Sequence, residues 1–383
     1  MTKFLLTVMM LLTASTSNSA QTVRERWSIR LTGEGGIQSF ERASLGIWSA
    51  QQGVVFLTPE RLLIYQVNEL AKVRLGARGA SGGGGNFVLA VRILDVRDGH
   101  EMDRNFFVTS AGSSSIVPTH DGKFLMRTGD ILSLCSANLK PKISRPLPMG
   151  REAVVDVWQV RATVSGSKAV LLHQQIFVHP EDSPDGQMIT PGKTHAAMEI
   201  LNADTLDSLK KAELPRYLRY WSAGENFLVT TDPAQPLDDG HYGTMDFDSN
   251  WTLLKVPGEE RQRSCTNVFM DALPHDLFAV RGCGMLTVFS ESGNKEFSAN
   301  VRGDETISSV ASAGHYMAAR FDRRMLSDSQ FRTRPLHIDV FDLNSRQRVT
   351  TVNLEKAVVT YDISSQGELA VIDGDTLRLY RPE

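Results

Sequence analysis

Two stretches that lie far apart in the chain repeat one another. Residues 122–136 read GKFLMRTGDILSLCS, and residues 367–381 read GELAVIDGDTLRLYR. Both begin with Gly, continue with an apolar run, turn at Gly-Asp and end in a segment of alternating apolar side chains. This pattern is typical of a β-hairpin closed by a tight turn. Because the hairpin recurs, it predicts a repeat architecture in which each copy buries its apolar faces against its neighbours.

The same arrangement occurs seven times along the chain. The hairpins begin at Gly53, Gly122, Gly166, Gly224, His275, Gly314 and Gly367. An apolar or aromatic strand precedes the hairpins, as in VDVWQV (155–160), and a polar-alternating strand follows them, as in QRVTTVNL (347–354). Units of four strands at this spacing are typical of propeller blades, which take roughly 40–50 residues each. The sequence therefore predicts an all-β chain folded as a seven-bladed β-propeller.

The two ends of the chain are expected to complete one blade together. The last unit stops after DTLRLYRPE, one strand short of four, whereas RERWSIRL (24–31) precedes the first unit without a hairpin of its own. We expect residues 24–31 to form the outer strand of the seventh blade, with Trp27 and Ile29 in the same sheet as Leu377 and Leu379. Such closure completes the last blade and leaves no blade with only three strands.

The first twenty residues have the pattern of a secretory signal peptide. A short basic start is followed by the uncharged apolar run FLLTVMMLLTA (4–14) and by a small, polar stretch that ends near Ser19 and Ala20. The apolar run is too short to cross a bilayer, which takes roughly 20 residues. We therefore expect a signal peptide over residues 1–20, a single propeller domain over residues 21–383, and a secreted or periplasmic protein with no membrane insertion after cleavage.

Charge and motifs exclude several classes of function. The formal net charge of −3 favours neither nucleic acid nor an anionic membrane surface as a partner. The Gly-x-Ser-x-Gly elbow of serine hydrolases is absent, and SGGGG (81–85) lacks the strand-to-helix context of a phosphate-binding loop. Acidic, His-containing stretches at 179–188 and 231–243 have no calcium-loop spacing. The sequence thus predicts no cofactor and no metal.

Three cysteines are compatible with one disulfide and one free thiol in an exported chain. If the fifth hairpin turns around Pro274, Cys265 and Cys283 face each other at the spacing that a disulfide needs. We expect these two to be bonded, the alternative being two unpaired thiols. Cys135 lies among apolar neighbours and is expected to be a free core residue.

Three segments share a third-strand-and-turn pattern: VFDLNSRQRV (340–349), ILDVRDGHEM (93–102) and ILNADTLDSL (200–209). In this repeat pattern the chain resembles the WD40-like and YVTN-like family of seven-bladed propellers. The Gly-His and Trp-Asp dipeptides of WD40 repeats are absent, so the side-chain network that they build is not expected. The repeated Ala-x-Asp-x-x-Thr-Gly of quinoprotein blades is also missing, which argues against pyrroloquinoline quinone.

Long insertions between the second and third strands predict a binding face. They span 68–85, 179–195, 231–242 and 322–335, and this connection lies on the same side of the ring in every blade. The first and last insertions are basic and the middle two acidic, which predicts a polarised face unless the charges are simply solvated loop residues. The candidate binding residues are Arg74, Arg78, Asp182, Asp185, Asp238, Asp239, His241, Arg323 and Arg324.

These observations favour a binding or scaffold module for a protein or peptide partner over an enzyme. The alternative is a lactonase-like or other propeller hydrolase, whose site would gather His, Glu and Arg around the central channel without a local motif. The channel distinguishes the two hypotheses. Convergent His and carboxylate side chains at one depth would favour the enzyme, whereas an apolar or plugged channel would favour binding.

Overall fold

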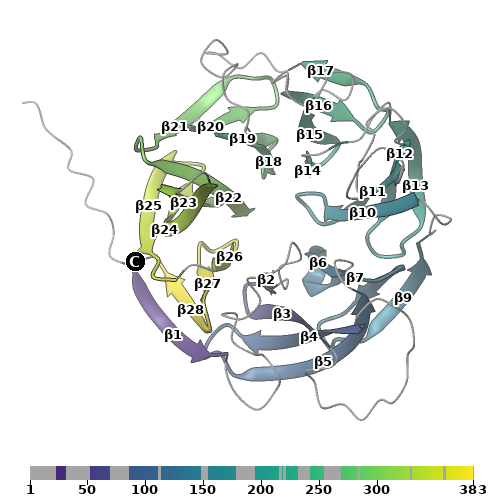
Figure 1. Cartoon of the computed structure of the whole chain (residues 1–383), viewed down its shortest axis with the longest axis horizontal. Coiled ribbons are helices and arrows are strands. Elements are labelled where there is room, and N and C mark those ends of the chain that lie inside the picture. The colour runs from purple at the N-terminus through teal and green to yellow at the C-terminus, as the bar shows by residue number, and fades with distance from the viewer. Residues whose placement is uncertain are drawn as a thin grey trace, which may run out of the picture.

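The chain is a seven-bladed β-propeller, in which seven four-stranded antiparallel sheets surround a central axis (Figure 1). The computed structural model describes residues 23–31, 52–69, 86–110, 114–147, 154–177, 195–214, 218, 221–231, 242–253, 269–282, 285–327, 330–356 and 359–382. No helix within these ranges has the length and apolar character needed to cross a membrane. The one helical element among them is a single 3₁₀ turn, η3 (His120–Gly122).

Each blade runs from an inner strand at the axis to an outer strand at the rim. The strands of blades one to four are β2 (Gln52–Thr58), β3 (Arg61–Glu69), β4 (Asn86–Asp95) and β5 (Glu101–Ser110); β6 (Ser114–Pro118), β7 (Phe124–Thr128), β8 (Ile131–Cys135) and β9 (Pro141–Pro146); β10 (Val154–Ala162), β11 (Lys168–Phe177), β12 (His195–Asn202) and β13 (Ser208–Leu214); and β14 (Trp221–Ala223), β15 (Phe227–Thr231), β16 (Tyr242–Asp246) and β17 (Trp251–Leu253).

Blades five to seven continue around the ring in the same order. Their strands are β18 (Phe269–Leu273), β19 (Leu277–Gly282), β20 (Met285–Ser290) and β21 (Lys295–Asn300); β22 (Glu305–Ala313), β23 (Tyr316–Ser327), β24 (Gln330–Asp342) and β25 (Gln347–Asn353); and β26 (Val359–Ile363), β27 (Leu369–Asp373), β28 (Thr376–Arg381) and β1 (Arg24–Arg30).

The seventh blade joins both ends of the chain. Strand β1 pairs antiparallel with β28 as the outermost strand of this sheet, with Trp27 opposite Leu379 and Ile29 opposite Leu377. This is the position that the strand deficit of the last repeat predicts. The indole nitrogen of Trp27 donates a hydrogen bond of 2.7 Å to the carbonyl oxygen of Val96 in blade one. Strand β1 therefore holds blade seven against blade one as well as completing its sheet.

The apolar core is divided into seven clusters, one between each pair of neighbouring blades. The cluster between blades five and six, for example, contains Val288 and Leu286 from one sheet and Phe321 and Met317 from the next. The cluster between blades seven and one contains Leu377 and Leu379 together with residues of β2 to β4. Each blade thus buries its two faces only against its neighbours, as expected of a repeat that cannot fold alone.

Buried and partly buried arginine side chains also link the blades near the axis. Arg127, Arg281 and Arg320 stand on the second strands of blades two, five and six, and each reaches the inner strand of the next blade. Their guanidinium groups donate to the carbonyl oxygens of Trp158 at 2.6 Å, Ser308 at 2.8 Å and Val359 at 2.7 Å, respectively. Since an unpaired buried carbonyl is costly, these bonds fix the spacing of neighbouring inner strands.

The two sides of the ring differ in their connections. On one side, turns of a few residues join the first strand of each blade to the second, at 59–60, 119–123, 163–167, 224–226, 274–276, 314–315 and 364–368. We call this side the short-turn face. The connections between second and third strands lie on the opposite side, the long-connection face. Those of blades one, three and four are long, as the sequence predicts, and lie outside the described residues.

Two sequence-based assignments differ from the structure. The hairpin that begins at Gly53 comprises the first two strands of blade one, not its middle two. Residues 322–335 are not a loop, because β23 and β24 continue as a long hairpin that is paired as far as Ser327 and Gln330. The sequence predicts an insertion between the second and third strands of this blade, whereas the structure extends both strands of the hairpin.

Candidate functional site

A cavity of about 730 Å³ opens on the propeller axis at the short-turn face. Residues from all seven blades line it, at the ends of the inner strands and in the turns that follow them. We call this cavity the funnel. It lies on the side of the ring opposite to the long connections, so the funnel and the predicted binding face are on different sides.

One residue of each inner strand contributes to the same layer of the funnel wall. The members of this axial layer, in blade order, are Phe56, Val117, Arg161, Ser222, Ala272, Ser312 and Asp362. Six of them are the second-to-last residue of their strand, and Phe56, beside a β-bulge in blade one, stands one position earlier. Two bonds link equivalent members of neighbouring blades, since the Ser222 hydroxyl accepts from the Ala272 amide at 2.9 Å and the Asp362 carboxylate accepts from the Phe56 amide at 2.8 Å.

Arg161 and Asp362 are the charged members of the axial layer and belong to blades three and seven, on opposite sides of the ring (Figure 1). Arg161 is exposed to the funnel, and its guanidinium carbon lies 5.5 Å from the centre of the Trp221 ring in blade four. Protein atoms of the surrounding ring nevertheless lower the pKa of Arg161 by desolvation, and this effect is partly offset by Asp271. The guanidinium stays charged at any physiological pH.

Asp362 lies at the seam between blades seven and one. Desolvation raises the pKa of its carboxyl group from 3.8 to about 7, although the backbone amides of Phe56 and Ile363 donate hydrogen bonds that favour the charged form. The side chain is partly open to the funnel, so water there reduces the desolvation that full burial would cause. Near neutral pH this carboxyl is expected to be only partly charged.

Asp362→Asn is expected to stabilise the protein at pH 8 and not at pH 4.5. Between about pH 4 and 7 the folded protein keeps this proton, whereas the unfolded chain has lost it. The stability that the carboxyl contributes therefore falls over this range and is lost once the pH has risen through 7. Asn keeps an acceptor for the Phe56 amide without a charge. We expect a gain on the order of 1–3 kcal/mol at pH 8, measured by urea unfolding. Exposed Asp130→Asn is the control, and an equal gain at both pH values would contradict this account.

Two histidines stand at the rim of the funnel, His120 in blade two and His275 in blade five. His120 is held by the neighbouring blade, since its Nε2 lies 3.0 Å from an Asp204 oxygen and its Nδ1 lies 3.1 Å from the Gly166 carbonyl oxygen. Lys123 binds the other oxygen of Asp204 at 2.5 Å. These contacts explain His120 as part of the joint between blades two and three.

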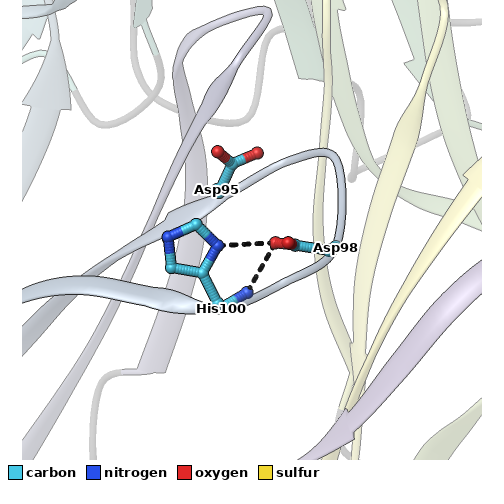
Figure 2. Close-up of side chains that lie close together, drawn as sticks. All are labelled: Asp95, Asp98 and His100. Atoms are coloured by element: carbon cyan, nitrogen blue, oxygen red, sulfur yellow. Dashed lines mark hydrogen bonds and ion pairs between the residues drawn. The ribbon is translucent and has the colours of Figure 1, made fainter.

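The described residues contain one group of side chains spaced closely enough to hold a metal ion: Asp95, Asp98 and His100 (Figure 2). It lies in the turn between β4 and β5, away from the funnel lining. Hydrogen bonds from the Arg97 side chain are the main reason that the pKa of Asp95 falls to about 2. His100 Nδ1 lies 2.7 Å from Asp98, and its backbone amide donates to the same carboxylate. A cation would compete with Arg97, so a well-bonded turn accounts for this group.

Few of the predicted site residues lie in the described part of the chain. Arg74, Arg78, Asp182, Asp185, Asp238, Asp239 and His241 all lie outside it. Arg323 is exposed on β23 and pairs with Asp304 at 3.2 Å. Arg324 also lies on β23, where its backbone pairs with Thr333. Of the candidates within the described ranges, neither Arg323 nor Arg324 lines the funnel, and Arg161 and Asp362 were not among the candidates.

The cysteine predictions have different outcomes. Cys135 is a free, buried thiol, and desolvation raises its pKa to about 12, so it is unreactive. Cys265 and Cys283 lie outside the described residues. The register used to predict their bridge is wrong, because Phe269 faces Arg281 and Leu273 faces Leu277, which centres the turn on His275 and not on Pro274.

Comparison with known proteins agrees with the fold. No protein-family model matches the sequence, and no curated protein is similar to it in sequence. The structure is similar to an acylaminoacyl peptidase from Pyrococcus horikoshii (TM-score 0.51, 10% identity, 86% of this chain and 52% of that chain). It is also similar to an acylaminoacyl peptidase in complex with Z-Gly-Gly-Phe-chloromethyl ketone (TM-score 0.52, 8% identity, 87% and 51%).

A third similar structure is BamB from Moraxella catarrhalis, with a TM-score of 0.40 and 10% identity over 94% of this chain and 98% of that one. The chain spans about half the length of the two peptidases. At these identities the similarity shows the propeller fold alone.

Proposed function

We propose that this protein is an exported β-propeller that binds a protein or peptide partner. The funnel is the observation that carries the proposal, because it is a concave site that all seven blades build on a rigid ring. Its volume lies within the range of roughly 300–1,000 Å³ that is usual for ligand pockets. Export to the periplasm or the cell exterior is supported by the signal-peptide pattern of residues 1–20 and is part of the proposal.

The chemistry of the funnel wall favours binding over hydrolysis. A hydrolytic site would need His and carboxylate side chains that converge on one point. In the described wall, His120 is engaged with Asp204 and Gly166, and the two charged members of the axial layer lie on opposite sides of the ring. The remaining members are small, hydroxylic or apolar. Such a wall can hold a polypeptide segment without reacting with it.

The long-connection face is a second surface within this proposal. Its basic candidates, Arg74, Arg78, Arg323 and Arg324, belong to blades one and six, which flank blade seven. Its acidic candidates, Asp182, Asp185, Asp238 and Asp239, belong to blades three and four. A partner of complementary charge on this face would bind more slowly as ionic strength rises.

Site-specific photo-cross-linking tests whether a partner enters the funnel. A photoreactive phenylalanine analogue at Val164, which is 39% exposed at the funnel rim, is compared with the same analogue at Leu209, 55% exposed on outer strand β13 of the same blade. In the exported fraction of the natural host, we expect position 164 to form a covalent adduct with a polypeptide. An excess of the same protein without the photoreactive analogue is expected to prevent this adduct. Adducts from position 209 alone, or from neither position, would contradict binding at the funnel.

A further inference from the structure

The funnel wall carries an exposed positive charge, the guanidinium of Arg161. The carboxylate that most affects Arg161 is Asp271 on β18. Asp271, however, is bound to Arg281 at 2.6 Å, and Arg281 also donates to the carbonyl oxygen of Ser308. No carboxylate within the described ranges forms an ion pair with Arg161. This side of the funnel, formed by blades three to five, therefore has an excess of positive charge.

Two carboxylates near this side of the rim, Glu225 and Asp204, are already engaged. Glu225, in the turn of blade four, accepts the Ser165 amide at 3.2 Å and lies 3.8 Å from Lys168. Asp204 is held by Lys123 and His120. The one carboxyl in the axial layer, Asp362, lies across the ring. None of these groups is placed to neutralise Arg161.

Arg161 is held in position by an aromatic platform. Trp221 is buried, and its indole nitrogen donates to the side-chain oxygen of Gln159 at 2.5 Å. A guanidinium over a tryptophan ring gains roughly 0.5–2 kcal/mol, yet the ring offers no oxygen acceptor to its five N–H donors. The Arg161 side chain is thus positioned, while no acceptor among the described residues is hydrogen-bonded to its guanidinium. A positioned side chain loses less entropy when a ligand binds.

A second donor stands next to Arg161 in the axial layer. The hydroxyl oxygen of Ser222 accepts from the Ala272 amide, so its hydrogen remains available to another acceptor. A planar guanidinium beside a hydroxyl group matches a carboxylate, which has two oxygens and accepts hydrogen bonds in its own plane.

We propose that the funnel binds an acidic peptide segment, whose carboxylate group is taken by Arg161 with the help of Ser222. This inference rests on the proposed function and names the chemistry of the partner. A peptide fits better than a small anion because the cavity of about 730 Å³ extends from Arg161 across uncharged wall residues such as Val117 and Ser312. The carboxylate comes from a Glu or Asp side chain or from a free C-terminus.

A synthetic hexapeptide array tests the proposal. Each sequence is made with Glu or Gln and with Asp or Asn at the varied positions, and with either a free or an amidated C-terminus. We expect the wild-type protein to prefer carboxylate-bearing peptides, with at least a tenfold loss of affinity when the carboxylate is replaced by an amide. Whether Glu→Gln or amidation causes the loss identifies the source of the carboxylate. Binding is expected to weaken as salt rises.

Three variants complete the design. Arg161→Gln is expected to remove the preference for carboxylates, and Arg161→Lys to keep part of it. Arg346→Gln changes an exposed arginine of the short-turn face that lies outside the funnel lining, and it is expected to leave binding unchanged. Thermal unfolding verifies that each variant is folded. Because the Arg161 side chain is exposed, its replacement is not expected to prevent folding.

The two proposals fail in different ways. Peptide binding without a carboxylate preference, or a preference that Arg161→Gln leaves intact, would overturn the role of Arg161 while peptide binding itself stands. If the wild-type protein binds no peptide on the array, both the role of Arg161 and the proposed peptide-binding function of the funnel are wrong.

Discussion

Replacing Arg320 with Met is expected to lower the free energy of unfolding by about 3–5 kcal/mol, measured by urea denaturation. The Arg320 guanidinium lies 3.0 Å from Asp322, whose side chain is 2% exposed, and it also donates to the Val359 carbonyl oxygen in the next blade. Removing the arginine leaves a buried carboxylate without its partner and a carbonyl oxygen without its donor. Both consequences destabilise the joint between blades six and seven.

The same strand supplies a control for this experiment. Arg323 pairs with Asp304, but both side chains are more than half exposed, so Arg323→Met is expected to cost less than about 1 kcal/mol. The double variant Arg320→Met, Asp322→Asn is expected to recover part of the loss, since it removes the unpaired charge as well. Equal losses for Arg320→Met and Arg323→Met would show that the buried pair does not hold the blades together.

Replacing Trp27 with Ala is expected to destabilise the protein by about 2–4 kcal/mol, because it removes a large apolar contact at the ring closure. Trp27 is half-buried in the cluster between blades seven and one, and it donates to the Val96 carbonyl oxygen. Its loss loosens β1 from β28 and exposes the edge of that strand. We therefore also expect association between molecules, measured by size-exclusion chromatography with light scattering.

Ser28→Ala is the matched control, because Ser28 neighbours Trp27 on β1 and is exposed. It is expected to change stability by less than about 0.5 kcal/mol. Trp27→Phe keeps most of the apolar contact and loses the hydrogen bond, so its effect is expected to be intermediate. A Trp27→Ala protein as stable and as monomeric as the wild type would mean that the closure strand contributes little to the ring.

The fold follows from the sequence because its signals are local and repeated. The pairing of β7 with β8 and of β27 with β28 is visible in the Gly-Asp turns and alternating side chains of 122–136 and 367–381. The position of β1 could be predicted by counting strands, because a closed ring needs four strands in every blade. Register was less predictable. In the fifth hairpin both His275 and Asp276 adopt positive φ, a turn geometry that the sequence around Pro274 does not specify.

The funnel could not be predicted because its residues are brought together by the ring and not by the chain. The seven members of the axial layer share a position within their blades, but their identities range from Ala to Arg. Arg161 did leave one signal, a positive charge at the second-to-last position of the strand VDVWQVRA. Long insertions drew the prediction to the opposite face, since loop length is visible in a sequence whereas a cavity between short turns is not.

The role of the inter-blade arginines likewise could not be predicted from the sequence. Arg127 stands in the opening repeat, GKFLMRTGD, where it looks like a polar residue that ends a strand. Its partner is the Trp158 carbonyl oxygen, 31 residues further along the chain. Backbone acceptors have no sequence signature, so such contacts appear only when neighbouring inner strands are placed side by side.

The closure strand has a consequence for the order in which the molecule can assemble. Strand β28 lies between β27 and β1, and the ion pair between Arg26 and Glu368 joins positions 342 residues apart. Contacts of such long range form late, because the entropy of closing the loop must be offset by structure already in place. Blades one to six contain all their own strands, but β1 has no partner until β28 is in place. Until then the folding protein is an open arc whose first strand is unpaired, and closure of the ring is expected to be its last step.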